Sequence, residues 1–101
     1  MRTITTEELH AIHEDPKGTI LDVRTPAEFS EGHIPGAVNI PHGDVAARLA
    51  EVPSDAPVYV HCKMGGRAQK AAAVLEAAGH DVVCVASGGM NAWTERGFPT
   101  A

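Results

Sequence analysis

The sequence predicts an α/β domain in which helices cover both faces of a mostly parallel sheet. Short apolar segments of strand character alternate with helical segments along the whole chain of 101 residues. Two of the apolar segments, 57–60 (PVYV) and 82–86 (VVCVA), are uninterrupted. Such runs are typical of parallel strands that are buried on both faces. The alternation favours a parallel sheet because parallel neighbours need a crossover connection between them.

The first half of the chain contains two capping boxes, in which a Thr and a Glu three residues later cap each other's backbone. They are Thr5 with Glu8 and Thr25 with Glu28, and Pro26 suits the first position of the second helix. The elements predicted from these signals and from the apolar runs are a short strand at Ile4, a helix over 5–14, a turn over 15–18, a strand over 19–23, a helix over 25–32 and a strand over 37–40.

The second half of the chain carries one amphipathic and one alanine-rich segment. Val45, Leu49 and Val52 fall on one face of a helix predicted over 44–51. The alanine-rich segment predicts a helix over 67–78 that ends at a capping glycine, Gly79. The remaining predicted elements are a loop over 53–57, strands over 58–61 and 81–86, and a last helix over 90–96 that follows Gly88-Gly89 and is ended by Gly97 and Pro99.

Length and composition predict one domain over residues 1–101 and exclude several classes of function. The net charge of −5 disfavours nucleic acid and anionic membranes as partners. No apolar run approaches the roughly 20 residues of a membrane span, and the first ten residues contain no signal-peptide core, so we expect a cytoplasmic protein. Its two cysteines are too few for a disulfide scaffold, and no set of histidines has metal-ligand spacing. We expect neither a metal nor a cofactor.

The most informative segment is HCKMGGRAQKAA, residues 61–72, where a buried strand runs through a glycine loop into a helix. Cys62 stands at the end of the strand, and Gly65 and Gly66 allow the following backbone to turn sharply. Such a loop can direct several N–H groups inward as a nest for an anion, and the helix that follows adds the positive end of its dipole. These features favour the thiolate form of Cys62, which is the nucleophilic form of cysteine.

The charges around this cysteine are also unusual for an acidic chain. Between Asp55 and Glu76 the only charged residues are Lys63, Arg67 and Lys70. A solvated helix start is the simpler explanation, but a basic segment beside a thiolate would also attract an anionic substrate. The candidate site therefore consists of Cys62 as nucleophile and, as groups that bind its substrate, Lys63, Met64, Gly65, Gly66 and Arg67. Cys84, inside an apolar strand, is instead predicted to be a small core residue.

The length of the loop separates two possible chemistries. Four residues lie between Cys62 and Arg67, whereas the signature of the cysteine phosphatases has five there and a Ser or Thr after the Arg, where this chain has Ala68. The shorter ring of amides fits one added sulfur atom better than a phosphoryl group with its equatorial oxygens. His61, directly before the cysteine as in phosphatases, keeps the second possibility open.

Three blocks of the sequence resemble the rhodanese domains, and most closely the compact single-domain thiosulfate sulfurtransferases. They are LDVRTPAEFSEGHIPGAVNIP at 21–41, CKMGGR at 62–67 and GGMNAW at 88–93, in that family's order and spacing. The resemblance implies a three-layer α/β/α fold with a five-stranded parallel sheet in the order 1-5-4-2-3. It also implies that Cys62 carries a sulfane sulfur as a persulfide and that the backbone of 63–67 cradles the outer sulfur.

In that strand order, the second and fourth strands are neighbours and the topological switch point lies between them. Ligands of open α/β sheets bind beyond the carboxyl ends of the strands at such a point. Asp22 lies at the end of the second strand and Arg24 directly follows that strand. We interpret both as supports of the loop, because a buried carboxylate needs a partner. Glu28 is interpreted as a helix cap, His33 as a residue that satisfies a turn, and Trp93 as a core residue under the last helix.

Three functions remain open at this point. The first is transfer of sulfur from thiosulfate or another persulfide to cyanide or a thiol through Cys62. The second is a cysteine phosphatase or arsenate reductase on the same fold. The third is a persulfide carrier that hands sulfur to a protein partner without turning over small acceptors. The sequence predicts the first, with a small anionic donor and a thiol, cyanide or protein acceptor as partners.

Overall fold

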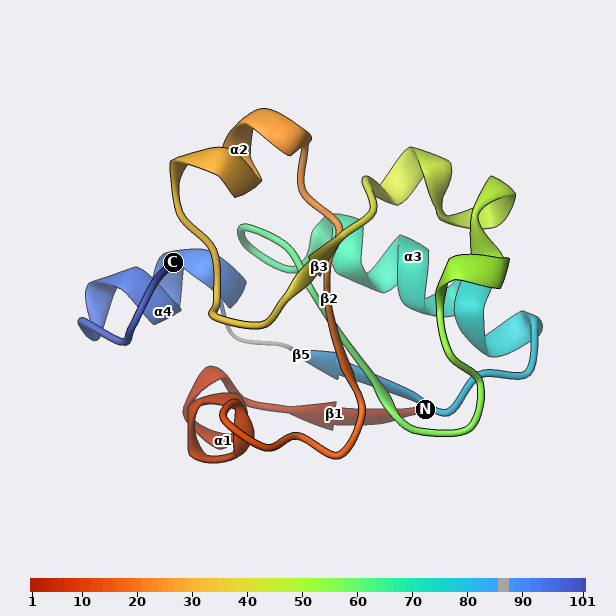
Figure 1. The fold of residues 1–101 in the computed structure, drawn as a ribbon, viewed down its shortest axis with the longest axis horizontal. Helices are drawn as coiled ribbons and strands as arrows, with labels where there is room; N and C mark the ends of the chain where they lie inside the picture. The colour runs from red at the N-terminus through yellow and green to blue at the C-terminus, as the bar shows by residue number, and fades with distance from the viewer. Residues whose placement is uncertain (86–87) are drawn as a thin grey trace.

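A computed structural model describes residues 1–85 and 88–101 of the chain and contains one parallel sheet (Figure 1). The strand order is β1-β5-β4-β2-β3 and every pairing is parallel, so the predicted topology is confirmed. The five strands are β1 (Arg2–Ile4), β2 (Thr19–Asp22), β3 (Val38–Asn39), β4 (Val58–His61) and β5 (Val82–Val85). The expected end of the fifth strand, Ala86, lies outside the described residues.

Helices form the two outer layers (Figure 1). One face carries α1 (Thr6–Ile12) and α4 (Gly89–Glu95), and the other carries α3 (Gly66–Ala77) with the short 3-10 helices η1 (His42–Ala47) and η2 (Leu49–Glu51). The remaining helix, α2 (Pro26–Glu31), lies beyond the carboxyl end of β2. Both predicted capping boxes are present at the starts of α1 and α2. No helix among the described residues is both long and apolar enough to cross a bilayer.

The sheet separates two apolar clusters. Leu21, Val60 and Cys62 point toward α3 and pack with its alanines and Leu75. Ile20, on the opposite face, packs with Leu9 of α1 and with Met90 and Trp93 of α4. Because alternate residues of a strand point to opposite faces, the central strands β2, β4 and β5 supply both clusters. Small alanines on α3 let that helix lie close to β4 and β5, and so place its first turn beside Cys62.

The main departure from the predicted elements is the segment expected to be a helix over 44–51. It forms the two 3-10 helices η1 and η2 instead, although Val45 and Val52 are buried as expected. The segment follows Pro41, contains Gly43 and has no side-chain cap at its start. Short segments without a cap commonly adopt 3-10 geometry. The other element ends differ from the predicted ones by a few residues, as helix and strand ends usually do.

Candidate active site

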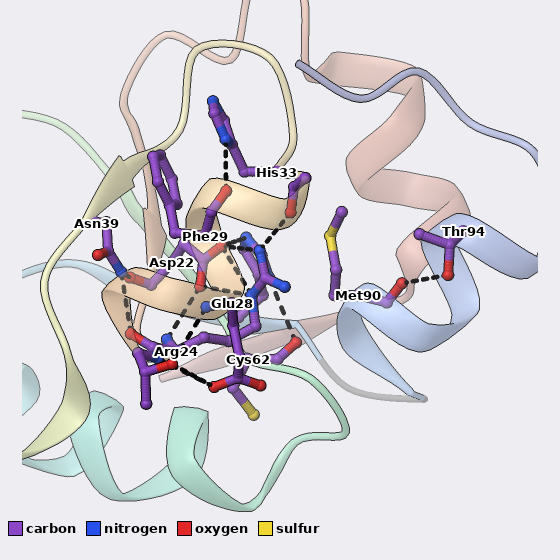
Figure 2. A network of polar contacts seen from close by, with 12 residues as sticks. Asp22, Arg24, Glu28, Phe29, His33, Asn39, Cys62, Met90 and Thr94 are labelled. Atoms are coloured by element: carbon purple, nitrogen blue, oxygen red, sulfur yellow. Dashed lines mark hydrogen bonds and ion pairs between the residues drawn. The ribbon is translucent and has the colours of Figure 1, made fainter.

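Cys62 lies directly after β4, and its sulfur is enclosed by the loop that leads into α3. Its residue exposure is only 1%, and in Figure 2 its side chain points toward α3. The Sγ atom accepts a hydrogen bond of 2.9 Å from the backbone N–H of Gly65. Gly65 has φ of 132°, a conformation that L side chains rarely adopt. The glycine therefore turns its own amide back onto the sulfur, three residues after it.

The first turn of α3 adds a further favourable field at the sulfur. This helix has 12 residues and begins at Gly66, one residue after the amide that binds Sγ. Its unpaired N–H groups carry the positive end of the helix dipole. The amide of Gly65 and the start of α3 thus both direct the positive ends of their dipoles at the buried sulfur.

The outer side of the loop is fixed by α4. The Cys62 carbonyl accepts the N–H of Met90 at 2.9 Å, and the Lys63 carbonyl accepts the N–H of Asn91 at 3.1 Å. This contact requires glycine at position 89, where φ is +48° and a Cβ atom would collide with the Cys62 carbonyl oxygen. The GGMNAW block thus has a structural meaning that the sequence alone does not show: it holds the backbone of Cys62, the predicted nucleophile.

Arg67, predicted to bind substrate, is held by α2. Its guanidinium donates to both carboxylate oxygens of Glu28 at 2.7 and 3.1 Å. The hydrogen bonds from Arg67 are the main reason why the pKa of Glu28 falls from 4.5 to about 2, and the bonds from Thr25 lower it further. Glu28 is therefore ionised at neutral pH and neutralises Arg67. It is a helix cap, as expected, but it also connects α2 to the start of α3.

Asp22 and Arg24 form a buried ion pair under the carboxyl ends of β2 and β4. The Asp22 carboxylate accepts the Arg24 backbone N–H and Nε at 3.0 Å and Nη2 at 2.7 Å. Arg24 Nη2 also donates to the carbonyl of Gly32 at 2.8 Å, at the end of α2. The pair satisfies the buried carboxylate, as the sequence requires, and it anchors α2 at the same time (Figure 2).

His61 lies beside this pair, on the face of the sheet opposite to the Cys62 sulfur. It is fully buried, and Nε2 is 3.9 Å from Asp22 Oδ2, which is too far for a hydrogen bond. Burial lowers the pKa of His61 more strongly than Asp22 raises it, so the ring is neutral near pH 7. The Nδ1 atom is 3.4 Å from the Cys62 carbonyl oxygen. The contact of His61 is therefore with the backbone of Cys62 and not with its thiol.

The tip of the loop is open to solvent. Lys63 is exposed, and Met64 is 70% exposed. Among the residues that the structure describes, Lys63 has no ion-pair partner, in contrast to Arg24 and Arg67. Lys63 is thus the one cation of the candidate set, within this part of the chain, whose charge is not already neutralised by a carboxylate.

A polar pocket of about 250 Å³ lies next to the loop, between α2 and α4. Figure 2 shows Met90 and Thr94 of α4 on one side of it and Arg24 and Glu28 on the other. Lys63 borders the pocket, but Cys62 is not among its lining residues. The remaining lining residues are Glu31, Gly32, Asn91 and Thr100.

The other residues considered from the sequence make no hydrogen bond to the Cys62 sulfur within the described part of the chain. Cys84 is buried in β5, and burial raises the pKa of its thiol, as fits a core residue. His33 stacks on Phe29 and bonds its carbonyl through Nδ1 at 3.0 Å. Trp93, a residue of α4, is fully buried in the apolar cluster between that helix and the sheet. Sequence reasoning missed the second role of Glu28 and the amides of Met90 and Asn91, although the spacing of the GGMNAW block had marked that segment as important.

Comparison with known proteins identifies the family. Residues 5–96 match the Rhodanese-like domain. The chain is 38% identical over 80 residues to a sulfurtransferase of Allochromatium vinosum, covering 79% of this chain and 75% of that protein. It is 40% identical over 92 residues to the chloroplastic thiosulfate sulfurtransferase 16 of Arabidopsis thaliana, covering 79% and 77% of the two chains.

A solved structure supports the same assignment. The crystal structure of a rhodanese-related protein from Thermoplasma volcanium matches with a TM-score of 0.91 and 31% identity, covering 100% of this chain and 98% of that one. Sequence, topology and the enclosed cysteine of the loop thus agree. The chain belongs to the rhodanese-like domain family, and sulfur transfer or sulfur carriage is its function at the level of that family.

Proposed function

We propose that this protein is a thiosulfate sulfurtransferase in which Cys62 carries the transferred sulfur as a persulfide. The observation that carries the proposal is the hydrogen bond of 2.9 Å from the Gly65 amide to Sγ, at the start of a 12-residue helix. An amide and a helix start that stabilise an anionic Sγ would equally stabilise the anionic outer sulfur of a persulfide. The enclosed position also protects that sulfur from water.

In the first step, the Cys62 thiolate attacks the outer sulfur of thiosulfate. A bond forms between Sγ and that sulfur, the sulfur–sulfur bond of thiosulfate breaks, and sulfite leaves with the bonding electron pair. The exposed charge of Lys63 guides the dianion toward the loop. Another persulfide donor would react in the same way, with a thiolate as leaving group.

In the second step, an acceptor attacks the outer sulfur of the Cys62 persulfide. Cyanide takes the sulfur as thiocyanate, or a thiolate takes it as a new persulfide, and Cys62 returns to its thiolate form. The two steps share the persulfide anion as their intermediate, so the Gly65 amide and the start of α3 stabilise the sulfur in both of them. We propose that the protein is located in the cytoplasm. A reducing compartment of this kind keeps Cys62 and Cys84 from forming disulfides between turnovers.

The phosphatase alternative receives less support from the site. A phosphoryl group carries three equatorial oxygens that need donors, and the loop arginine is the usual cation for such a group. Here Arg67 is already bound by both oxygens of Glu28, and only four residues separate it from Cys62.

Intact-mass measurement tests the proposal. After incubation with thiosulfate, the reduced protein should gain the mass of one sulfur, and cyanide should remove it and release thiocyanate. Cys62→Ser should gain nothing, whereas Cys84→Ala should load like the parent. A parent protein that gains no sulfur contradicts the proposal, and loading without thiocyanate release favours the carrier function. Turnover of an aryl phosphate or arsenate that depends on Cys62 would favour the phosphatase alternative.

A further inference from the structure

The carboxylate of Glu28 occupies Arg67 in the way that an oxyanion from solution would. Arg67 donates from Nη1 to Oε1 at 2.7 Å and from Nη2 to Oε2 at 3.1 Å. This is the two-pronged geometry in which a guanidinium binds a carboxylate, a phosphate or a sulfate. Each of the two side chains is 28% exposed, so the pair is not sealed from solvent. An anion that binds the guanidinium in this geometry must first displace Glu28.

A second set of hydrogen bonds holds Glu28 in this position. Its Oε1 atom also accepts the backbone N–H and the hydroxyl of Thr25, each at 3.1 Å, while the Glu28 N–H donates to Thr25 Oγ1 at 3.2 Å. Because this capping box already orders the carboxylate, little further conformational entropy is lost when it binds Arg67. A tethered group of this kind competes with free anions at an effective concentration on the order of 1 mM or more.

Arg67 belongs to the same helix start that faces the sulfur. It is the second residue of α3, and the Gly65 amide that binds Sγ lies two residues before it. The hydrogen bonds to Glu28 are the main reason why the pKa of Arg67 is raised, and the charge of an ionised Cys62 raises it further. The first N–H groups of a helix lack partners within it and attract anions. Without Glu28, the guanidinium and these amides would together form an oxyanion site beside the sulfur.

Sulfur transfer does not require such an oxyanion site. The reacting atom of thiosulfate is its outer sulfur, which must reach Sγ, whereas its oxygen atoms leave with the sulfite. Lys63 is exposed at the tip of the loop and supplies one positive charge for the approach of the donor. Sulfate and phosphate have no outer sulfur to transfer, so an oxyanion bound beside Cys62 would only block it. A single exposed cation holds such ions weakly, whereas a free Arg67 would hold them with two hydrogen bonds.

We propose that Glu28 is a specificity-determining residue, an internal anion that keeps sulfate, phosphate and similar oxyanions from binding at Arg67. The inference rests on the proposed function, because the site that Glu28 protects is the site of sulfur loading. Glu28 acts on the reaction through Arg67 and does not itself contact the donor. Since the pKa of Glu28 is about 2, its carboxylate stays ionised at every pH near neutrality, and the exclusion does not depend on pH in that range.

Titration with sulfate tests the exclusion without requiring any sulfur transfer. Sulfate is added to the reduced protein at constant ionic strength while the amide resonances of Gly66 and Ala68, in the first turn of α3, are followed. We expect weak shifts that do not saturate in the parent. Glu28→Gln should show saturable shifts and bind sulfate about fivefold to tenfold more tightly. A Glu28→Gln variant that binds sulfate no better than the parent would overturn the inference.

Two further variants show whether the gain depends on Arg67. Glu31→Gln removes the same charge from an exposed position of the same helix and should bind sulfate like the parent. The double variant Glu28→Gln with Arg67→Gln should lose the gain. An equal gain in Glu31→Gln, or a gain that survives in the double variant, would contradict the proposed contact. If Glu28→Gln is only partly folded, the rise of its unfolding temperature with sulfate, relative to Glu31→Gln, gives the same comparison, because a ligand of the folded state stabilises it.

Loading kinetics connect the exclusion with sulfur transfer and separate this inference from the proposed function. Sulfate should raise the apparent KM for thiosulfate in Glu28→Gln at concentrations about fivefold to tenfold lower than in the parent, without changing the rate at saturating thiosulfate. Slower loading of Glu28→Gln with the sulfate sensitivity of the parent would indicate a merely structural role and refute this inference alone. Tighter sulfate binding by Glu28→Gln, in a protein that loads no sulfur, would refute the proposed function and the role of Glu28 in choosing donors together.

Discussion

Glu28 shows how one side chain can serve a helix and an active site at once. Its Oε1 atom accepts the Thr25 backbone N–H at 3.1 Å, as a capping box requires, and also Arg67 Nη1 at 2.7 Å. The first role is visible in the sequence, because the Thr–Glu spacing is local. The second joins residues 39 positions apart and depends on how α2 and α3 are placed by the sheet. A local pattern cannot predict such a pair.

The depressed pKa of Glu28 gives a prediction for stability against pH. Its pKa is about 2 in the folded protein and near 4.5 in an unfolded chain, so its contribution is complete above about 4.5 and is lost as the pH falls toward 2. The side chain is 28% exposed, and the contribution should be about 1–3 kcal/mol. Glu28→Gln, which keeps the capping box, should lower stability most at pH 7, less at pH 3 and hardly at all below pH 2.

Urea unfolding at pH 7, 4 and 3 measures this difference. Glu95→Gln changes an exposed carboxyl of α4 and serves as the control. A gap between parent and Glu28→Gln that stays constant from pH 7 to pH 3 would contradict the assigned ion pair.

At the scale of elements, the active loop depends on two helices that approach it from different sides. The start of α3 supplies the field at the sulfur, and α4 supplies the amides that hold the carbonyls of Cys62 and Lys63. The sequence predicted α3 and its loop well, because a strand, two glycines and an alanine-rich helix give strong local signals. It predicted α4 as a helix but not its contact with the nucleophile, because no local pattern encodes which carbonyls a distant amide will meet.

Substitution of Gly89 tests the contact with α4. Gly89→Ala places a Cβ atom against the Cys62 carbonyl oxygen in addition to straining a positive φ. Gly97→Ala has the same backbone strain at φ of +70° but open space around the new atom. We expect Gly97→Ala to cost about 1–2 kcal/mol and to load sulfur normally, whereas Gly89→Ala should cost more and load slowly.

Thermal unfolding and the rate of sulfur loading from thiosulfate, measured on both glycine variants, give the comparison. Equal losses of stability and of loading rate in the two variants would mean that backbone strain alone is responsible. The contact between the new Cβ atom and the Cys62 carbonyl oxygen would then have no effect of its own.

The two capping boxes provide a second test at this scale. Thr5→Ala and Thr25→Ala remove the same hydrogen bonds from the starts of α1 and α2, and each should cost about 1 kcal/mol of stability. Only the second box shares its carboxylate with Arg67, so only Thr25→Ala should also slow sulfur loading. Stopped-flow loading kinetics at matched fractions of folded protein measure this effect. A slower rate in both variants would show that the loss is due to stability and not to Arg67.

For the whole molecule, the net charge and the charge near the nucleophile have opposite signs. The chain carries −5 overall, while Lys63 is exposed and unpaired within the described residues of the site. A dianionic donor is repelled by the molecule at long range and attracted by the loop at short range. Salt screens the two effects over a Debye length of about 8 Å at physiological ionic strength.

We predict that the attraction between Lys63 and the donor, and not the net charge of the protein, decides the rate of sulfur loading. The second-order rate constant for loading from thiosulfate should fall as NaCl is raised, and Lys63→Gln should reduce or reverse that dependence. Alkylation of Cys62 by neutral iodoacetamide is the control, since its rate should depend little on salt. A parent rate constant that rises with salt would show that the overall negative charge controls the approach of the donor.

The fold as a whole could be predicted almost completely from the sequence. Capping boxes, apolar runs and the order of the three rhodanese-like blocks fix the number of strands, their order and the position of the loop. The segment after Pro41 differs, because a weakly capped stretch of eight residues has little preference between α and 3-10 geometry. The site was predicted only as far as it is contiguous in sequence, since the partner of Arg67 and the amides that hold the carbonyls of Cys62 and Lys63 are contributed by other elements.

The main-chain bonds from α4 to the loop have an evolutionary consequence. The carbonyls of Cys62 and Lys63 are held by the amides of Met90 and Asn91, and a bond donated by a backbone N–H does not depend on which side chain that residue carries. Exposed side chains at the loop tip, such as those of Lys63 and Met64, can therefore be exchanged during evolution without moving the backbone of Cys62.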